Sequence, residues 1–554
     1  MVKETLRKAI ANALLIAPEN VRLERAPSFT GADFAMAAKK DKAQDAGEIK
    51  KCLEIDKEIA ALVSKIEVKG MFVNFFLSPE LLGRELHRIL GEKNQYGSSE
   101  EGKGETIVVD YSGPNVAKRF SVGHLRSSVI GQALYNLYAF LGYKVIGDNH
   151  LGDWGTQFGI IIAQIVRKDL DAKKLTVEDL EQLYVEFNKE MIENPALREE
   201  AKSWFKKLED GDTRARSIWQ IVVATSMKEF EKIYDLLDIH IDHAYGESFY
   251  EDKMPAVIKE LEKKGLITDS QGARVVEVGE NMPSAIIIKS DGTTTYFLRD
   301  LATTQFRLNE WHPERIVYEV GSDQILHFRQ LFAAEHLLGW DKGVEFKHVA
   351  HGLIRFKEGK MSTRKGQTIK LEDVLNEAIK RAREIIDLSE TARGLSEKEK
   401  EEVAKAVGIG AVKYFDLSHN PASDILFEWE KLFQLEGNSA PYLQYTNARI
   451  QSLLKKGGTA DSQVTEETVE EAEAALLRAM IHFPDAVKAS ADQYAPNLLC
   501  NFLFELAQGY NNFYSKCRVL GSERETFRLQ LSKAVGSVIQ SGLSLLGIKA
   551  PERM

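Results

Sequence analysis

Residues 106–146 constrain the fold more than any other part of the chain, because two kinds of hydrophobic pattern alternate there. Thr106-Ile107-Val108-Val109 is a short continuous apolar run, typical of a strand buried on both faces of a parallel sheet. Apolar residues then recur at helical spacing from Leu125 to Leu141, and a second strand-like run begins at Lys144. Strand, helix and strand in this order predict a βαβ unit in a doubly wound α/β domain.

The rest of that domain is interrupted. Residues 170–240 are highly charged and mostly helical in pattern, which indicates an insertion between two halves of the α/β domain. We expect the sheet to resume at Ser284–Lys289 and again at Arg315–Val320, with a helix from about His327. Before the domain, residues 71–77 resemble a strand and a helix follows at about 79–91. Beyond about Leu371 the pattern is almost entirely helical, with further helices at 471–491, 496–516 and 527–546.

These patterns divide the chain into four parts. The predicted fold is a Rossmann-like, doubly wound parallel-sheet domain between an α+β N-terminal domain and an all-α C-terminal bundle. The predicted boundaries are 1–93 for the N-terminal domain, 94–370 for the α/β domain with a helical insertion at about 170–285, 371–430 for a helical connector and 431–554 for the bundle.

Composition excludes several classes of protein. The chain has 554 residues, of which 44% are hydrophobic and 28% charged, so several cores can be filled. Cys52, Cys500 and Cys517 lie far apart and cannot supply four thiolates, so we expect reduced thiols and no structural zinc or other bound metal. No signal peptide or apolar run of about 18 residues is present, which predicts a cytosolic protein without a membrane span. The net charge of -10 argues weakly against nucleic-acid binding, although a local basic stripe can still hold a phosphate backbone.

The first segment that suggests chemistry follows the strand at 106–109. Asp110 and Asn115 lie where that strand ends, and ligands of doubly wound sheets bind beyond the carboxyl ends of strands. Ser121-Val122-Gly123-His124 lies where the next helix begins, and free N–H groups at a helix start attract phosphate. Gly123 would let a base or phosphate approach the backbone, and His124 could donate a hydrogen bond to it. Tight packing around Gly123 and a gap-filling His124 are the alternative.

The second segment is a basic run. Residues 356–370 contain five basic residues and one acidic residue, and Gly359 and Gly366 flank Lys360-Met361-Ser362-Thr363-Arg364-Lys365. A cationic loop that can move suits the charge that develops on phosphoryl oxygens in a transition state. A charged loop that is simply solvated is the alternative by charge alone.

Together the two segments resemble the paired signature motifs of class I aminoacyl-tRNA synthetases. Residues 149–159 (NHLGDWGTQFG), 296–300 (YFLRD), 412–418 (VKYFDLS), 511–514 (NNFY) and 517–520 (CRVL) narrow the resemblance to the arginyl-tRNA synthetase family. Two positions depart from the usual motifs. Ser121 stands where the first motif normally has a histidine, and Thr363 stands at the second lysine of the basic motif.

The resemblance implies ATP-dependent activation of L-arginine and its transfer to the 3' end of tRNA(Arg). The family's contacts to arginine fall on Asp110, Asn115, His124, Tyr296, Asp300 and Gln324. Carboxylates suit a planar guanidinium with five donors, so Asp300 is expected to bind it, with Tyr296 one helical turn earlier. The alternatives are a core role for Tyr296, a helix cap for Asp300 and a plain loop for Gln324.

The same resemblance assigns the nucleotide and the chemistry. Gly123, His124, Gly352, Leu353, Lys360, Met361 and Ser362 are expected to bind ATP with Mg²⁺. The expected catalytic residues are His124, Lys360, Arg364, Lys365 and Ser121.

The flanking domains are expected to hold tRNA. The N-terminal domain would contact it through Asn74 and Phe76, and the C-terminal bundle would bind the anticodon through Tyr445 and Tyr514. Further candidates in the bundle are Tyr442, Asn447, Arg449, Asn512 and Arg518. We expect a monomer that binds neither DNA nor a membrane.

Three other identities stay open at this stage. A cysteinyl-tRNA synthetase shares the layout, but it needs clustered zinc ligands that this sequence lacks. A nucleotidyltransferase shares the first motif but needs no anticodon-binding bundle. A non-catalytic tRNA-binding paralogue would explain Ser121 and Thr363.

Overall fold

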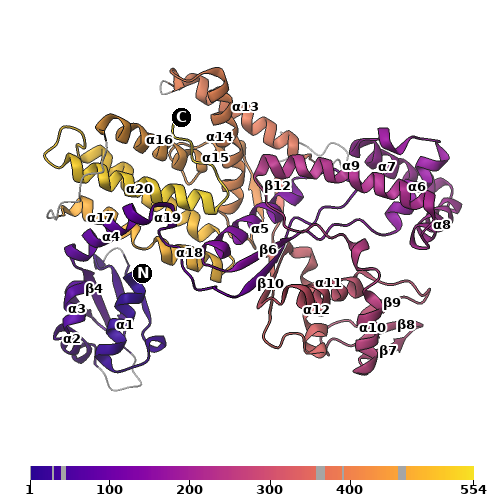
Figure 1. The fold of residues 1–554 in the computed structure, drawn as a ribbon, viewed down its shortest axis with the longest axis horizontal. Coiled ribbons are helices and arrows are strands. Elements are labelled where there is room, and N and C mark those ends of the chain that lie inside the picture. The colour runs from indigo at the N-terminus through magenta and orange to yellow at the C-terminus, as the bar shows by residue number, and fades with distance from the viewer. Residues whose placement is uncertain (1, 28–29, 39–44, 357–368, 390–391, 459–468) are drawn as a thin grey trace. The chain divides into compact units, whose positions relative to one another are not determined.

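The computed structural model describes residues 2–27, 30–38, 45–356, 369–389, 392–458 and 469–554 (Figure 1). The chain forms two compact units. The first contains residues 1–99, 382–414 and 431–554, and the second contains residues 100–381 and 415–430. None of the described helices is long and apolar enough to cross a membrane. The cytosolic location stays a prediction.

A four-stranded parallel sheet forms the centre of the second unit. Its strands are β5 (Thr106–Asp110), β6 (Lys144–Asp148), β10 (Arg315–Gly321) and β11 (Glu345–His351), in the order β11-β10-β5-β6. Every neighbouring pair is parallel, which confirms the predicted doubly wound fold. The chain leaves β5 toward β6 and later returns to β10 on the other side of β5. The carboxyl ends of β5 and β10 therefore form the switch point at which such sheets bind ligands.

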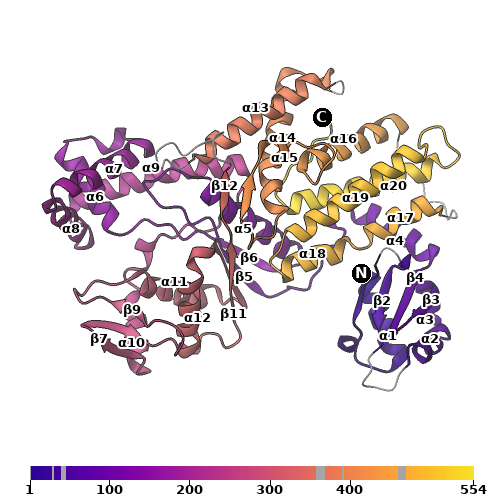
Figure 2. The ribbon, with the colours of Figure 1, turned by 180° about the vertical axis from the view of Figure 1, so that it is seen from behind.

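Three helices carry the residues that face this switch point. They are α5 (Gly123–Phe140), α11 (Tyr296–Trp311) and α12 (Ile325–Leu338) (Figures 1 and 2). Helix α5 contacts β5, β6 and β10, and twelve of its residues are buried. Apolar residues of α11, α12, β5 and β10 share one core, which includes Val108, Leu298, Ile316 and Leu331. The two strands and the two helices are thus held together next to the switch point.

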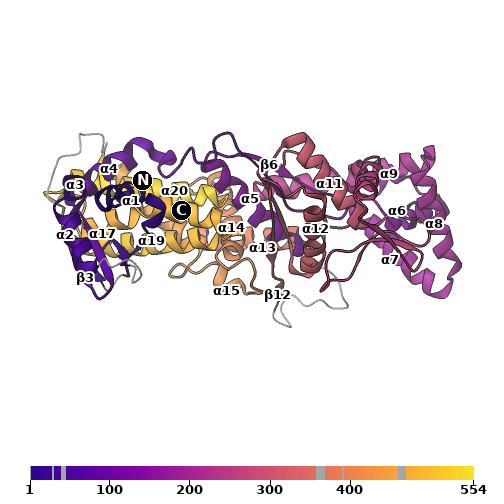
Figure 3. The same ribbon diagram turned by 90° about the horizontal axis from the view of Figure 1, so that it is seen from below.

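The inserted segment is helical only in part. Helices α6 (Thr156–Arg167), α7 (Val177–Glu193), α8 (Ala196–Glu209) and α9 (Thr213–Leu237) lie together (Figure 3), and α10 (Met254–Lys263) follows. An antiparallel sheet of β7 (Ile267–Ser270), β8 (Ala273–Val276) and β9 (Ala285–Ile288) comes next. The expectation that Ser284–Lys289 continues the parallel sheet is therefore wrong, because β9 pairs with β8 instead. A short apolar run predicts a strand but not the sheet that it joins.

The first unit begins with an α+β region. Strands β1 (Leu23–Arg25), β2 (Phe34–Ala37), β3 (Val63–Lys69) and β4 (Phe72–Leu77) form an antiparallel sheet in the order β1-β2-β4-β3. Helices α1 (Val2–Leu14), α2 (Ala46–Glu54) and α3 (Lys57–Leu62) precede β3, and α4 (Pro79–Glu92) follows β4. Ser78 caps α4 by accepting from Leu81 N–H. The predicted strand and helix at 71–91 are confirmed as β4 and α4.

The remainder of that unit is a helical bundle. It contains α14 (Glu397–Leu417), α16 (Ala440–Gly457), α17 (Glu471–Met480), α18 (Phe483–Asp492), α19 (Asn497–Lys516) and α20 (Glu525–Leu545). The helical stretch at 471–491 is divided at Ile481-His482, and Pro484 lies in the first turn of α18, where a proline is tolerated. Helix α13 (Leu371–Leu388) and the short α15 (Trp429–Leu432) connect the two units. Between them, β13 (Ile425–Phe427) pairs in parallel with β12 (Ile354–Phe356), so the connector is not entirely helical.

A buried ion pair joins the end of α14, which belongs to the second unit, to the α/β core. The Arg126 side chain on α5 is 1% exposed, and its Nε donates to Asp416 Oδ2 at 3.1 Å. Its Nη1 donates to the carbonyl oxygens of Gly352 and Ser423 at 3.0 and 2.7 Å. A Cβ on Gly352 would lie 2.5 Å from the Ser423 backbone, so glycine is required where these segments meet.

We expect Arg126→Leu to lower the free energy of unfolding by about 3–5 kcal/mol, because it leaves Asp416 buried and unpaired. Arg355→Leu is the matched control. The Arg355 side chain pairs with Asp424 at 2.7 Å but is 66% exposed, so its loss should cost less than about 1 kcal/mol. Urea denaturation followed by circular dichroism measures both changes. Equal costs at the two positions would contradict a structural role for the buried pair.

Candidate active site

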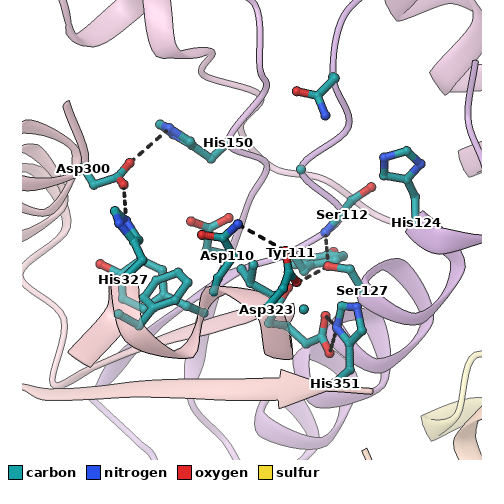
Figure 4. A pocket seen from close by; sticks show the side chains of 18 of the residues that line it. Asp110, Tyr111, Ser112, His124, Ser127, His150, Asp300, Asp323, His327 and His351 are labelled. Atoms are coloured by element: carbon teal, nitrogen blue, oxygen red, sulfur yellow. Dashed lines mark hydrogen bonds and ion pairs between the residues drawn. The ribbon is translucent and has the colours of Figure 1, made fainter. Parts of the chain in front are cut away.

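A cavity of about 650 Å³ opens at the switch point of the parallel sheet (Figure 4). The carboxyl ends of β5 and β10, the start of α5 and the first turns of α11 and α12 all contribute to its wall. Nine of the predicted site residues line it: Asp110, Asn115, Ser121, Gly123, His124, Tyr296, Asp300, Gln324 and Leu353. Gly352 is not part of the lining, although it directly precedes Leu353. Lys360, Met361, Ser362, Arg364 and Lys365 lie outside the described residues.

Two strand ends place a pair of carboxylates behind the cavity. Asp110 and Asp148 are opposite each other in the register of β5 and β6. The fully buried guanidinium of Arg307 on α11 lies 2.7 Å from an oxygen of each. Burial raises the pKa of Asp148, and Arg307 partly opposes this effect. Asp110 therefore meets the cavity as an already paired carboxylate, which the sequence did not indicate.

At one end of the cavity, Asp300 lies between two histidines (Figure 4). Its Oδ2 is 2.6 Å from Nε2 of His327, and its Oδ1 is 3.7 Å from Nε2 of His150. Burial favours the neutral acid, but the hydrogen bond and charge of His327, together with His150 and Arg299, outweigh burial and lower the pKa of Asp300. Burial also disfavours the His327 cation, yet Asp300 raises the pKa of His327 overall. Asp300 is thus an ionised carboxylate at neutral pH.

A second carboxylate, Glu247, stands at the same end. It begins the 3-10 helix η5 (Glu247–Tyr250) and accepts from Arg299 Nη1 at 2.9 Å. Burial raises the pKa of Glu247 to about 8, although Arg299 opposes this effect. The Arg299 guanidinium also lies 5.5 Å from the centre of the Tyr296 ring, and Tyr296 itself is 62% exposed. This end therefore offers two carboxylates and an accessible aromatic ring, a set that suits a planar cation.

The other end of the cavity is the start of α5. Gly123 is the first residue of the helix, and the N–H groups of His124 and Leu125 donate to the carbonyls of Ser121 and Val122 at 3.0 and 3.1 Å. Ser121 N–H donates to Nδ1 of His124 at 3.1 Å, and the Ser121 hydroxyl lies 3.0 Å from the same nitrogen. Burial lowers the pKa of His124 to about 4. A neutral imidazole that accepts at Nδ1 carries its proton on Nε2, so His124 can donate a hydrogen bond from that atom.

The chain on either side of the basic segment also reaches this end. Val122 N–H donates to the Ile369 carbonyl at 3.2 Å, and Ser121 forms an antiparallel bridge with Lys370. On the other side of the segment, Leu353 lines the cavity just before β12. The flank at Ile369-Lys370 is therefore anchored at the helix start, and the flank at Leu353 reaches the same cavity.

His351 adds a second imidazole near the helix start. It ends β11, and its Nδ1 lies 3.0 Å from Oε1 of Glu319. Burial opposes a charge on the ring, but Glu319 outweighs burial and raises the pKa of His351. His351 therefore favours the cationic form more than His124 does. The two rings lie on the same side of the view in Figure 4.

The predicted tRNA contacts lie in the other unit. Asn74 on β4 is buried, whereas Phe76 is half-buried with the Lys65 ammonium 5.0 Å from its ring centre. In the bundle, the Arg449 guanidinium lies 4.8 Å from the ring of Tyr445 and 5.4 Å from the ring of Tyr514. The structure thus gathers Tyr445 and Tyr514 around one arginine.

The further residues of the bundle that were predicted to contact tRNA differ in solvent exposure. Asn512 and Arg518 are exposed. Asn447 is fully buried and donates to the Pro551 carbonyl at 3.0 Å, so it supports the bundle.

Sequence reasoning missed several residues that line the cavity. Glu247, His150, His327, Arg307, Glu319 and His351 all contribute to the wall. Helical spacing offers one signal that could have been used, because Asp300 and Arg307 are about two turns apart on α11. For Glu247 the sequence holds no such signal, because η5 reaches the cavity only through the tertiary fold.

Comparison with known proteins agrees with this geometry. Residues 85–429 match the family described as tRNA synthetases class I (R), catalytic domain, and residues 443–554 match the DALR anticodon binding domain. The chain is 42% identical over 506 residues to an arginine–tRNA ligase of Chloroflexus aggregans, which covers 89% of this chain and 88% of the relative. It is 40% identical to that of Streptococcus uberis, covering 100% of this chain and 98% of the relative.

Solved structures agree as well. The fold matches arginyl-tRNA synthetase from Thermus thermophilus with a TM-score of 0.86 at 24% identity, with 100% of each chain covered. It matches the Plasmodium falciparum enzyme with a TM-score of 0.83 at 25% identity, covering 100% of this chain and 98% of the other. The resemblance inferred from the two motifs is confirmed, and the chain belongs to the arginyl-tRNA synthetases, the class I ligases for arginine and its tRNA.

Proposed function

We propose that arginine and ATP with Mg²⁺ meet in the cavity at the switch point, where arginine is activated and then passed to the 3' end of tRNA(Arg). The observation that carries this proposal is the opposite character of the two ends of the cavity. Asp300 forms an anionic end with the Glu247 carboxyl beside it, whereas Gly123 and His124 at the start of α5 form an end that suits a phosphate. A substrate that is cationic at its side chain and reacts with a phosphate at its carboxylate fits between them.

The proposed reaction has two steps. The carboxylate of arginine attacks the α-phosphate of ATP, which forms arginyl-adenylate and releases pyrophosphate. The arginyl group then passes to the terminal adenosine of the tRNA. Positioning and charge stabilisation account for such a reaction, so no side chain needs to act as a nucleophile. Mg²⁺ enters with the phosphates as part of the substrate.

The anionic end would hold the guanidinium. Asp300 is ionised and faces the cavity, Glu247 lies at the same end, and Tyr296 offers an accessible ring. Asp110 and Asn115 would bind the α-amino and carboxylate groups of arginine, because they lie at the end of β5 between the two ends of the cavity. Gln324 would contact the same part of the substrate from the start of α12.

The helix start would hold ATP. The partial positive charge of the helix start would attract the phosphates, and the Nε2–H of His124 would donate to them. The Ser121 contacts with Nδ1 support a helper role, in which Ser121 fixes the imidazole rather than binding phosphate itself. Leu353 and the neighbouring Gly352 would pack against the adenosine.

The basic segment would complete the nucleotide site. We assign Lys360, Arg364 and Lys365 to the phosphates, with Met361 and Ser362 beside the nucleotide. The flanking Ile369 is anchored at the start of α5 and Leu353 lines the cavity, which supports this assignment.

The tRNA would be held by the first unit. The half-buried Phe76 is better placed than the buried Asn74 to meet a base by stacking. Tyr445, Arg449 and Tyr514 form a group of two rings and one cation that suits an unstacked anticodon base.

Asp300→Asn should raise the KM for arginine at least about 100-fold, because a charge-assisted contact to the guanidinium is lost in a half-buried site. Pyrophosphate exchange that depends on arginine, with and without tRNA, measures this change, and the same assay with other amino acids tests the proposed substrate. The KM for ATP should stay within about twofold of wild type, since Asp300 lies at the other end of the cavity.

Asp341→Asn is the matched control for that substitution. Asp341 hydrogen-bonds His336 at 2.6 Å, the distance that also separates Asp300 from His327, and Asp341 does not line the cavity. Its loss should leave arginine kinetics unchanged. An unchanged arginine KM in Asp300→Asn would refute the proposed guanidinium site.

The KM for arginine should fall as the pH rises. A guanidinium prefers the ionised form of Glu247, and burial raises the pKa of that carboxyl to about 8. The fraction of ionised Glu247, and with it the affinity, should therefore increase about eightfold from pH 7 to pH 8.5. Steady-state kinetics across this range test the slope, with the KM for ATP as the internal reference. Glu247→Gln should weaken binding and flatten the profile; a slope that survives in this variant would assign the titration to another group.

Lys360→Ala should lower kcat at least about 100-fold while the Kd for tRNA changes less than about twofold, because the lost charge stabilises the transition state. Single-turnover activation and a filter-binding titration separate the two quantities. Lys289→Ala, a change of another lysine in the same unit, serves as the control. An equal loss of activation and of tRNA affinity would make the basic segment a tRNA contact instead.

A further inference from the structure

The segment after β5 has an unusual backbone. Ser112, Gly113 and Ala117 have φ angles of 75°, 54° and 63°, so two residues with a Cβ adopt the left-handed conformation. A Cβ disfavours this conformation, and surrounding contacts are needed to hold it. Asn115 lies between Ser112 and Ala117 and is exposed toward the cavity. The contacts that hold these two residues therefore also set the position of Asn115.

Helix α9 of the inserted segment supplies part of those contacts, beside α5, whose Ser127 Oγ accepts from Ser112 N–H at 2.9 Å and whose Ser128 hydroxyl donates to Ser112 Oγ at 3.0 Å. Ala117 N–H donates to Oγ of Ser226 at 2.9 Å, and Oγ of Ser112 lies 2.9 Å from the hydroxyl of Tyr234. Ser226 and Tyr234 are both buried and are about two helical turns apart. The same face of α9 thus reaches both ends of the segment that carries Asn115.

The Tyr234 hydroxyl closes a ring of hydrogen bonds. It accepts from Nδ2 of Asn149 at 2.9 Å, and Oδ1 of Asn149 accepts from Gly113 N–H at 3.0 Å. Burial raises the pKa of Tyr234 to about 12, so the hydroxyl stays protonated and can donate to Ser112. Three chain segments, from the ends of β5 and β6 and from α9, meet at this hydroxyl.

Packing around Asn115 leaves little freedom for another arrangement. Asn115 pairs with Gly152 in an isolated parallel bridge, and a Cβ on Gly152 would lie 2.5 Å from Oδ1 of Asn115. Phe120, at the end of the same loop, packs edge-on against Phe230 and Tyr234 of α9, with ring centres 5.7 and 5.8 Å apart. Helix α9 therefore touches the loop along its length.

We propose that α9 is a positioning element of the arginine site, in which Ser226 and Tyr234 hold Ser112 and Ala117 left-handed and so direct Asn115 at the substrate. This inference rests on the proposed contact between Asn115 and arginine. Neither Ser226 nor Tyr234 lines the cavity, so each acts through the loop and not on the substrate.

Ser226→Ala and Tyr234→Phe should each raise the KM for arginine about threefold to tenfold, the effect of losing a buried hydrogen bond. The KM for ATP should change less than about twofold. Ser217→Ala, an exposed serine on the same helix, should leave both values unchanged. Tyr414→Phe removes a buried hydroxyl that also has two hydrogen-bond partners, but in the bundle. It controls for a general loss of stability, which thermal unfolding monitors.

A second substitution separates positioning from stability. Adding Ala117→Gly to Ser226→Ala should restore most of the lost arginine affinity, because glycine adopts the left-handed conformation without a Cβ clash. A loss of stability alone would not be corrected in this way. If Tyr234→Phe does not fold, Ser226→Ala with and without Ala117→Gly tests the role of α9 alone, because Ser226→Ala removes a single buried oxygen.

The outcomes also separate this inference from the proposed site. An unchanged arginine KM in Asn115→Ala would overturn the placement of arginine against Asn115, and this inference with it. If Asn115→Ala raises the arginine KM while Ser226→Ala and Tyr234→Phe leave it at the wild-type value, only the role of α9 is overturned. An equal rise in the KM values for arginine and ATP, without rescue by Ala117→Gly, would likewise overturn it.

Discussion

The buried guanidinium of Arg307 is the interaction on which the site depends. It bonds Asp110 and Asp148, so it ties the carboxyl ends of β5 and β6 to α11. Its charge is removed from water, and such a charge is tolerated only where partners surround it. Because Asp300 lies about two turns earlier on α11, the same contact sets where Asp300 meets the cavity. Strands β5 and β6 and helix α11 are thereby held together.

The local part of this arrangement could be predicted from the sequence. Asp110, Asn115, Gly123 and His124 lie close together in the chain, and the rule that ligands bind at strand ends brings them to one place. The partners of Arg307 and the position of Glu247 could not be predicted, because they arise between segments far apart in the chain. Strand β11 was missed for another reason. Its residues Glu345-Phe346-Lys347-His348 mix charged and apolar types, as suits an edge strand, and lack the apolar run of a buried one.

Ser121, which stands where the first motif normally has a histidine, contacts the histidine that remains in the motif. Its backbone N–H and hydroxyl both approach Nδ1 of His124, so the residue acts on the remaining histidine of the motif. A neutral His124 that donates from Nε2 would give the phosphates a directional hydrogen bond but no full positive charge. In the proposed site, the helix start would orient the phosphates, and the basic segment would neutralise their charge.

The arginines of the protein itself also shape the choice of substrate. Arg307 forms an ion pair with Asp110, and Arg299 forms one with Glu247. The Arg299 guanidinium also lies over the ring of Tyr296, whereas Asp300 contacts histidines. Asp300 thus differs from Asp110 and Glu247 in that its ion pairs are with histidines and not with an arginine. In the proposed site the substrate would lie with its guanidinium toward Asp300 and its carboxylate toward α5. The internal ion pairs at Asp110 and Glu247 would then leave Asp300 as the carboxylate most open to the substrate guanidinium, which disfavours binding end for end.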